Sequence, residues 1–164
     1  MIAPRKETDP VPGLNIGTET DAFFQPGGRL AQACSTDEFP FEPRPQQRDM
    51  AAAVAHALED GTHLAVEAGT GVGKSFAYLV PLILGSLARN IQVVVSTYTI
   101  SLQEQLILKD IPFLQQHMGR SFKAVLVKGR SNYLCRRRLA RARKMSRDLF
   151  QAEEEDDIER IRVW

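Results

Sequence analysis

The first sustained hydrophobic pattern in the chain begins after Pro45 and has the spacing of an amphipathic helix. Apolar side chains recur there at intervals that place them on one face of a helix; they are Met50, Val54, Ala57 and Leu58. The pair Asp60-Gly61 is typical of a turn and ends this element. We therefore expect a helix that starts near Pro45 and ends at Asp60.

Three short apolar runs follow, and each is typical of a strand that is buried on both faces. They cover residues 63–67, 91–96 and 122–127. Between them, the apolar spacing predicts a helix from about Lys74 to Arg89, kinked at Pro81, and another from about Thr99 to Lys109 that ends before Pro112. Strands that alternate with helices in this way predict an α/β fold, with a parallel sheet flanked by helices.

The region before Phe41 differs from the rest because proline and glycine interrupt it and no apolar period is sustained. We expect an arm that lies on the domain or is partly disordered and that supplies no core element. The expected division of the chain is an N-terminal arm over residues 1–40, a domain over residues 41–128 and the beginning of a further domain over residues 129–164.

Charge is divided between two opposed blocks, so the net charge of +1 is only an average. Residues 120–147 contain eleven lysines and arginines and no acidic residue, whereas residues 153–159 contain six acidic residues and no base. We expect a basic helix from about Tyr133 to Arg147, followed by an exposed acidic segment. So dense a basic stretch favours contact with nucleic-acid phosphates, although a solvated helix face is the usual explanation of a charge run.

Length and apolar content exclude several classes of protein. The 164 residues suit one domain, or one domain with part of a second. The N-terminus lacks the apolar region of a signal peptide, and the longest apolar run, residues 76–84, is too short to cross a bilayer. The two cysteines, Cys34 and Cys135, lie far apart. We expect a reduced, cytoplasmic protein with no membrane association and no structural disulfide.

A glycine-rich loop lies between the first predicted strand and the helix after it. The segment is Ala68-Gly69-Thr70-Gly71-Val72-Gly73-Lys74-Ser75, a phosphate-loop (Walker A) pattern with alanine in place of the first glycine. Glycines let backbone N–H groups turn toward an anion, and the helix N-terminus adds its positive dipole end. We expect this loop to bind ATP, with Lys74 on the β- and γ-phosphates and Ser75 on Mg²⁺. The strand–loop–helix context disfavours a chance match.

Three segments resemble the iron–sulfur helicases of the DinG/XPD type, within superfamily 2. Residues 41–50 resemble the Q motif, residues 67–81 motif I and residues 95–106 motif Ia. The resemblance implies that Gln47 recognises adenine, because an amide can donate and accept at once. It also implies that Thr97 and Thr99 contact DNA phosphates. The structural alternatives are a polar residue at a helix start and a threonine N-cap.

Residues 128–135, Lys-Gly-Arg-Ser-Asn-Tyr-Leu-Cys, match the point at which that family enters its iron–sulfur domain. The resemblance implies that Cys135 is the first of four ligands of a [4Fe–4S] cluster. The surrounding arginines favour a thiolate there, although a lone cysteine is more often a buried apolar residue. Arg130 and Tyr133 are candidates for DNA contact. Tyr133 is equally well explained as a packed aromatic or as a base-stacking surface.

The resemblance implies a P-loop RecA-like fold, here the partial first helicase domain, followed by the start of the iron–sulfur domain. It implies a monomeric, ATP-dependent DNA helicase of 5′–3′ polarity that acts in repair or replication on single-stranded and duplex DNA. The 164 residues carry no Walker B or DEAH carboxylate pair. We therefore expect an N-terminal fragment that binds ATP–Mg²⁺ weakly and hydrolyses it negligibly. The alternatives are another P-loop NTPase, or a non-catalytic nucleotide- or nucleic-acid-binding protein.

Overall fold

The computed structural model describes residues 10–35, 41–144 and 160–161, and it divides the chain into two compact units, Met1–Val125 and Leu126–Trp164. The first unit contains α1 (Ile16–Phe24), α2 (Arg29–Cys34), α3 (Pro45–Asp60), α4 (Lys74–Arg89), α5 (Ile100–Gln105), the π-helical turn η1 (Leu106–Asp110) and α6 (Ile111–His117). The second contains the 3-10 turn η2 (Arg130–Asn132) and α7 (Arg136–Lys144). None of these helices is long and apolar enough to cross a membrane.

The two helices expected on either side of the glycine-rich loop are confirmed. α3 ends as predicted, at Gly61, whose left-handed conformation (φ 66°) is one that glycine adopts readily. α4 runs without interruption through Pro81, which is fully buried. α3 and α4 pack on each other, and Ala51 and Ala55 on α3 and Ala77 on α4 are fully buried in the same hydrophobic cluster. Small side chains allow the two backbones to approach closely.

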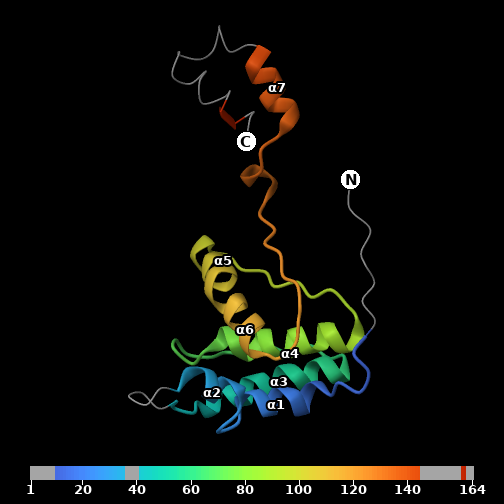
Figure 1. Ribbon diagram of the computed structural model, residues 1–164, viewed down its shortest axis with the longest axis vertical. Helices are drawn as coiled ribbons and strands as arrows, with labels where there is room; N and C mark the ends of the chain where they lie inside the picture. The colour runs from blue at the N-terminus through green and yellow to red at the C-terminus, as the bar shows by residue number, and fades with distance from the viewer. Residues whose placement is uncertain (1–9, 36–40, 145–159, 162–164) are drawn as a thin grey trace. The chain divides into compact units, whose positions relative to one another are not determined.

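The expectation that the residues before Phe41 supply no core element is wrong. α1 and α2 form there, and Ile16, Phe23, Phe24 and Leu30 belong to the same buried cluster as the residues of α3 and α4. Asn15 caps α1, because its side chain accepts a hydrogen bond of 2.7 Å from the Thr18 N–H. In Figure 1, α1, α3 and α4 pack side by side. α1 is too short to show a sustained apolar period in the sequence, because prolines and glycines flank it.

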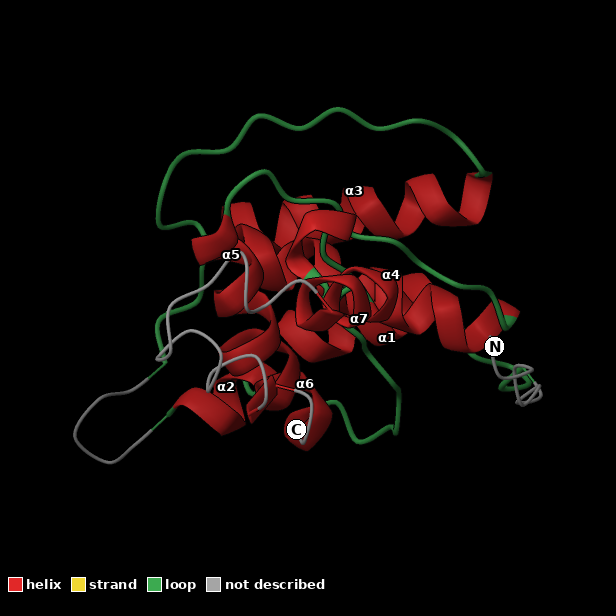
Figure 2. Cartoon of the chain, turned by 90° about the horizontal axis from the view of Figure 1, so that it is seen from above, coloured by secondary structure: helices red, strands yellow, loops and turns green. Residues whose placement is uncertain are grey.

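The parallel sheet predicted from three apolar runs is not confirmed, since residues 63–67, 91–96 and 122–127 are loops (Figure 2). Several of their apolar side chains stay exposed, among them Val94 at 88% and Val125 at 83%. An apolar run forms a buried strand only where a neighbouring strand accepts its backbone hydrogen bonds and both faces are covered. The described residues contain no strand, and their helices pack on one another instead.

The helix expected from Thr99 to Lys109 is longer than predicted and continues past Pro112. α5, η1 and α6 follow one another, and in η1 the Ile111 N–H bonds to the Leu106 carbonyl, five residues back. Pro112 then occupies the first turn of α6, directly after the hydrogen-bonding pattern changes from that of η1. The proline therefore marks a change of helical pitch and not the end of the helix.

Replacing Phe23 with alanine tests whether the N-terminal helices belong to the core. Phe23 is 3% exposed and packs edge-to-face on Phe24, with ring centroids 5.2 Å apart. We expect Phe23→Ala to lower the free energy of unfolding by about 3–5 kcal/mol, measured by chemical denaturation, because it leaves a cavity. Tyr98→Ala, at a fully exposed side chain, is the control and should change stability by less than about 0.5 kcal/mol. Equal stability of the two variants would contradict the packing described here.

Candidate functional site

Two glycines of the predicted phosphate loop take left-handed backbone conformations. Gly71 and Gly73 take left-handed φ values of 79° and 87°, which side chains with a Cβ rarely adopt. Gly73 is also the N-cap of α4, so the unpaired N–H groups of that helix begin directly after the loop. An anion held here would meet backbone donors and the positive end of a helix of 16 residues.

Lys74 lies over the loop and contacts its backbone. Its ammonium group donates hydrogen bonds to the carbonyls of Ala68, at 2.9 Å, and Gly69, at 2.7 Å. The side chain is exposed, so a phosphate oxygen can replace these carbonyls without any rearrangement of the core. Burial raises the pKa of Tyr78, and a hydrogen bond with the Ser75 side chain opposes that rise. Thr70 and Val72 complete the loop.

Gln47 is packed against the phosphate loop. It is 5% exposed, and its Nε2 donates a hydrogen bond of 2.9 Å to the Gly73 carbonyl. A Cβ on Gly73 would clash with that amide nitrogen. Three residues earlier, Arg44 Nη1 donates to the Gly71 carbonyl at 3.0 Å. The side chains of the segment predicted as the Q motif therefore hold the loop through its backbone carbonyls. The sequence pattern does not indicate these contacts.

Thr97 and Thr99 have unequal capacity for phosphate contact. The Thr97 hydroxyl donates to the Thr99 carbonyl at 3.2 Å, which engages its single proton. The Thr99 hydroxyl accepts from the Leu102 N–H at 3.3 Å as the N-cap of α5, so its proton is left to donate. Tyr98 lies between them and is fully exposed. Sequence reasoning missed this aromatic side chain, although its position between two hydroxyl residues of the motif was visible.

In the second unit, Tyr133 closes a short loop with its hydroxyl and exposes its ring. The Lys128 N–H donates to the Tyr133 hydroxyl oxygen at 2.8 Å, and Asn132 Nδ2 donates to the Gly129 carbonyl at 3.2 Å. Tyr133 as a whole is 54% exposed. Arg130 begins η2 and is also exposed. The structure brings Arg130 and Tyr133 together within one turn.

Cys135 directly precedes α7, and its carbonyl accepts the Leu139 N–H at 2.9 Å. A hydrogen bond from the Arg138 backbone N–H lowers the pKa of the Cys135 thiol below its ordinary value of 9.0, against an opposing effect of burial. The N–H and the charge of Arg137 act in the same direction as Arg138. Within the described ranges, no three histidine, cysteine or acidic residues gather into a metal site. α7 begins three residues after the predicted start of the basic helix at Tyr133, and residues 145–147 of that prediction and the acidic segment 153–159 lie outside the described residues.

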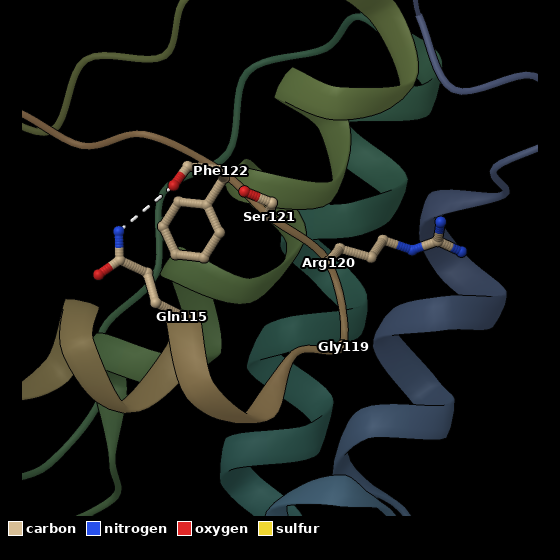
Figure 3. Close-up of a pocket in the computed structure, with 5 residues that line it drawn as sticks. All are labelled: Gln115, Gly119, Arg120, Ser121 and Phe122. Carbon is tan, nitrogen blue, oxygen red and sulfur yellow. Dashed lines mark hydrogen bonds between the residues drawn. The ribbon is translucent and has the colours of Figure 1, made fainter.

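A cavity of about 330 Å³ lies beside the end of α6, and Figure 3 shows the five residues that line it: Gln115, Gly119, Arg120, Ser121 and Phe122. Gln115 Nε2 donates to the Phe122 carbonyl at 3.3 Å, and the Arg120 side chain extends to Glu19 on α1, at 3.1 Å. The Arg120 side chain is thus already paired, although Arg120 begins the basic stretch predicted to contact DNA, and none of the five residues is a predicted nucleotide-binding residue. We assign this cavity no part in the nucleotide site.

Comparison with known proteins gives the family. A model of the DEAD/DEAH box helicase family matches residues 45–149, more than half of the chain. The chain belongs to the DEAD/DEAH box helicase family. Membership implies a P-loop RecA-like fold, and it agrees with the positions of the phosphate loop and α4. The sheet of that fold is the part that the described residues do not form. No solved structure matches the chain.

Individual relatives of the chain are named as ATP-dependent helicases. The chain is 55% identical over 93 residues to the ATP-dependent helicase DinG of Mycobacterium tuberculosis. The aligned segment covers 54% of this chain and 14% of that protein. It is 40% identical over 141 residues to the ATP-dependent DNA helicase YoaA of Escherichia coli, and this segment covers 86% of this chain and 21% of YoaA. DinG of Salmonella choleraesuis is 43% identical over 107 residues, covering 63% and 15%. The resemblance to DinG-type helicases is confirmed, and the chain spans between a seventh and about a fifth of these relatives.

Substitution of Gly73 tests the loop geometry. We expect Gly73→Ala to reduce the affinity for ATP–Mg²⁺ by at least about tenfold, because a Cβ is strained at φ 87° and clashes with Gln47. Gly27 is a matched control, since its φ is 78° but no atom lies within 4 Å of a Cβ built there. Gly27→Ala should therefore lower stability and leave the affinity unchanged in isothermal titration calorimetry. If both variants lose ATP affinity, backbone strain alone explains the loss, and the clash with Gln47 does not contribute.

We expect the two cysteines to be alkylated with different pH profiles, because only the thiolate reacts and the pKa values of the two thiols are shifted in opposite directions. Burial raises the pKa of Cys34, opposed by the charge of Arg44, whereas the pKa of Cys135 is lowered. As the pH rises, Cys135 should therefore become reactive first. Iodoacetamide modification, followed by mass spectrometry of the peptides, measures both sites in one sample. The pKa assignments are contradicted by coincident profiles or by earlier reaction of Cys34.

Proposed function

We propose that the whole protein is an ATP-dependent DNA helicase, and that this chain supplies the part of it that binds ATP. The observation that carries the proposal is the phosphate loop at the N-terminus of α4, held by Gln47 within the segment that matches the helicase family. The relatives named as ATP-dependent DNA helicases support it. The 5′–3′ polarity and the role in repair or replication come from the family resemblance.

In the proposed site, the loop binds the phosphates of ATP and α4 supplies two further groups. Lys74 exchanges the Ala68 and Gly69 carbonyls for β- and γ-phosphate oxygens, and the Ser75 hydroxyl coordinates Mg²⁺. Gln47 donates its amide hydrogen to Gly73, which leaves the amide oxygen to accept from the amino group of adenine. The 164 residues contain no Walker B pattern to orient the attacking water, so the proposal assigns this segment nucleotide binding.

The proposed DNA contacts are electrostatic and hydrophobic, without base-specific hydrogen bonds. Thr99 has a proton to donate to a phosphate, and the exposed ring of Tyr98 suits stacking on a base. In the second unit, the exposed Tyr133 and Arg130 offer the same two chemistries. α7 has the sequence RRRLARARK, which adds a dense positive charge. Thr97 is the weakest of these candidates, because its proton is already engaged.

Cys135 is proposed as one ligand of an iron–sulfur cluster, which supplies a rigid crosslink or redox centre when bound. Its lowered pKa favours the thiolate that iron requires. A cluster of this kind needs four such ligands, however, and this chain contains two cysteines. The described residues therefore do not form a cluster site by themselves, and no function of this chain is derived through one.

Lys74→Ala in the full-length protein tests the helicase proposal. We expect ATPase activity and unwinding to fall together to background, because the γ-phosphate loses its cation. Binding of single-stranded DNA without nucleotide should stay within about twofold, since Lys74 lies on the phosphate loop. Lys109→Ala, at an exposed lysine of η1, is the control and should keep both activities. Normal unwinding by Lys74→Ala would rule out the phosphate-loop assignment.

The basic stretch should bind single-stranded DNA with a steep salt dependence. Each phosphate contact contributes a slope of about −0.7 to log K against log salt. Replacing Arg136, Arg137 and Arg138 together with glutamine should make the slope shallower by up to about 2, measured by fluorescence anisotropy. Arg120→Gln is the control, because Arg120 is paired with Glu19. A salt titration of the unmodified chain with no slope would instead favour a solvated helix face.

A further inference from the structure

Arg44 contacts the phosphate loop in a way that neither the nucleotide chemistry nor the family match assigns. It is the N-cap residue of α3, and its Nη1 donates a hydrogen bond of 3.0 Å to the Gly71 carbonyl. One turn later on the same segment, Gln47 donates to the Gly73 carbonyl at 2.9 Å. The start of α3 therefore engages alternate carbonyls of the loop, at its two left-handed glycines.

The direction of a carbonyl fixes the direction of the next amide. In a trans peptide, the C=O of one residue and the N–H of the following residue point to opposite sides, and the chain has no cis peptide bonds among its described residues. When Gly71 directs its carbonyl to Arg44, the Val72 N–H points away from Arg44. The Gly73 carbonyl and the Lys74 N–H are related in the same way through Gln47.

We infer that Arg44 is a positioning residue of the phosphate loop: by holding the Gly71 carbonyl, it turns the Val72 N–H toward the bound phosphates. This inference rests on the proposed ATP binding. Gly71 has no Cβ and takes a positive φ, so its peptide can rotate unless a partner restrains it. Lys74 does not supply that restraint, because its ammonium group contacts the carbonyls of Ala68 and Gly69.

The arginine suits this role because of its chemistry and its surroundings. A guanidinium stays charged at every physiological pH, and its hydrogen bond to a carbonyl is stronger than that of a neutral donor. The side chain is exposed and forms no ion pair with a described acidic residue. Arg48, one turn along α3, provides a contrast, because it pairs with Asp21 at 2.8 Å and does not contact the loop.

The experiment measures the affinities of the 164-residue chain for ATP–Mg²⁺ and for inorganic tripolyphosphate. We expect Arg44→Ala to weaken both by the same factor, about tenfold. Arg44→Lys should recover part of the loss, since an ammonium group can also donate to the Gly71 carbonyl. Arg48→Ala is the matched control and should leave both affinities unchanged. A loss confined to ATP would overturn the inference, because Arg44 would then act on the nucleoside.

A second readout separates positioning from a general structural effect. The backbone ¹⁵N–¹H signal of Val72 should shift when tripolyphosphate is added, and in Arg44→Ala this shift should be much reduced while the Ala77 signal behaves as before. An unchanged Val72 shift in Arg44→Ala overturns the inference and leaves the proposed function standing. Failure of the unmodified chain to bind either ligand overturns the proposed function and the inference together.

Discussion

Backbone amides can bind a phosphate only if the carbonyls of the same peptides are held in other directions, and the first unit is organised around that constraint. Gly71 and Gly73 take positive φ angles, and glycine peptides rotate easily unless a partner restrains them. The restraint comes from α3, through Arg44 and the buried amide of Gln47. α3 packs on α4 along the core that contains Ala51, Ala55 and Ala77, so its first turn lies beside the loop that begins α4.

The N-terminal helices support the same arrangement from the other side. Phe23 and Phe24 of α1 pack in the cluster that contains Val80 and Leu84 of α4. Arg48 on α3 pairs with Asp21 on α1 at the exposed side of the two helices. Such an exposed pair contributes little stability, and the aromatic packing is the larger contribution. The core and the nucleotide site are therefore one structural unit, although the sequence separates their parts.

The elements that the sequence predicted well are those specified by local interactions. α3 and α4 have sustained apolar periods, and the loop between them has the glycine spacing of a phosphate site, so both follow from neighbouring residues. The sheet depends on partners far away in the chain, and an apolar run such as residues 91–96 cannot show whether a partner is present. The contact between Gln47 and Gly73 joins residues 26 apart in sequence. The family resemblance identified both residues, but only the fold shows that they touch.

The π-helical turn before Pro112 has a consequence for any alignment of this segment with other helicases. Successive buried positions there are Leu106, Ile111 and Leu114, with a first interval of five residues. In an α-helix each residue advances by about 100°, so a five-residue step would place Ile111 about 140° from Leu106, on the far side. The wider turn absorbs the surplus residue and returns Ile111 to the core. A relative lacking one residue between positions 106 and 110 would keep the same buried face with an unbroken α-helix. Alignment gaps of one residue at this point therefore preserve the packing, whereas the same gap elsewhere in the helix would rotate one half against the other.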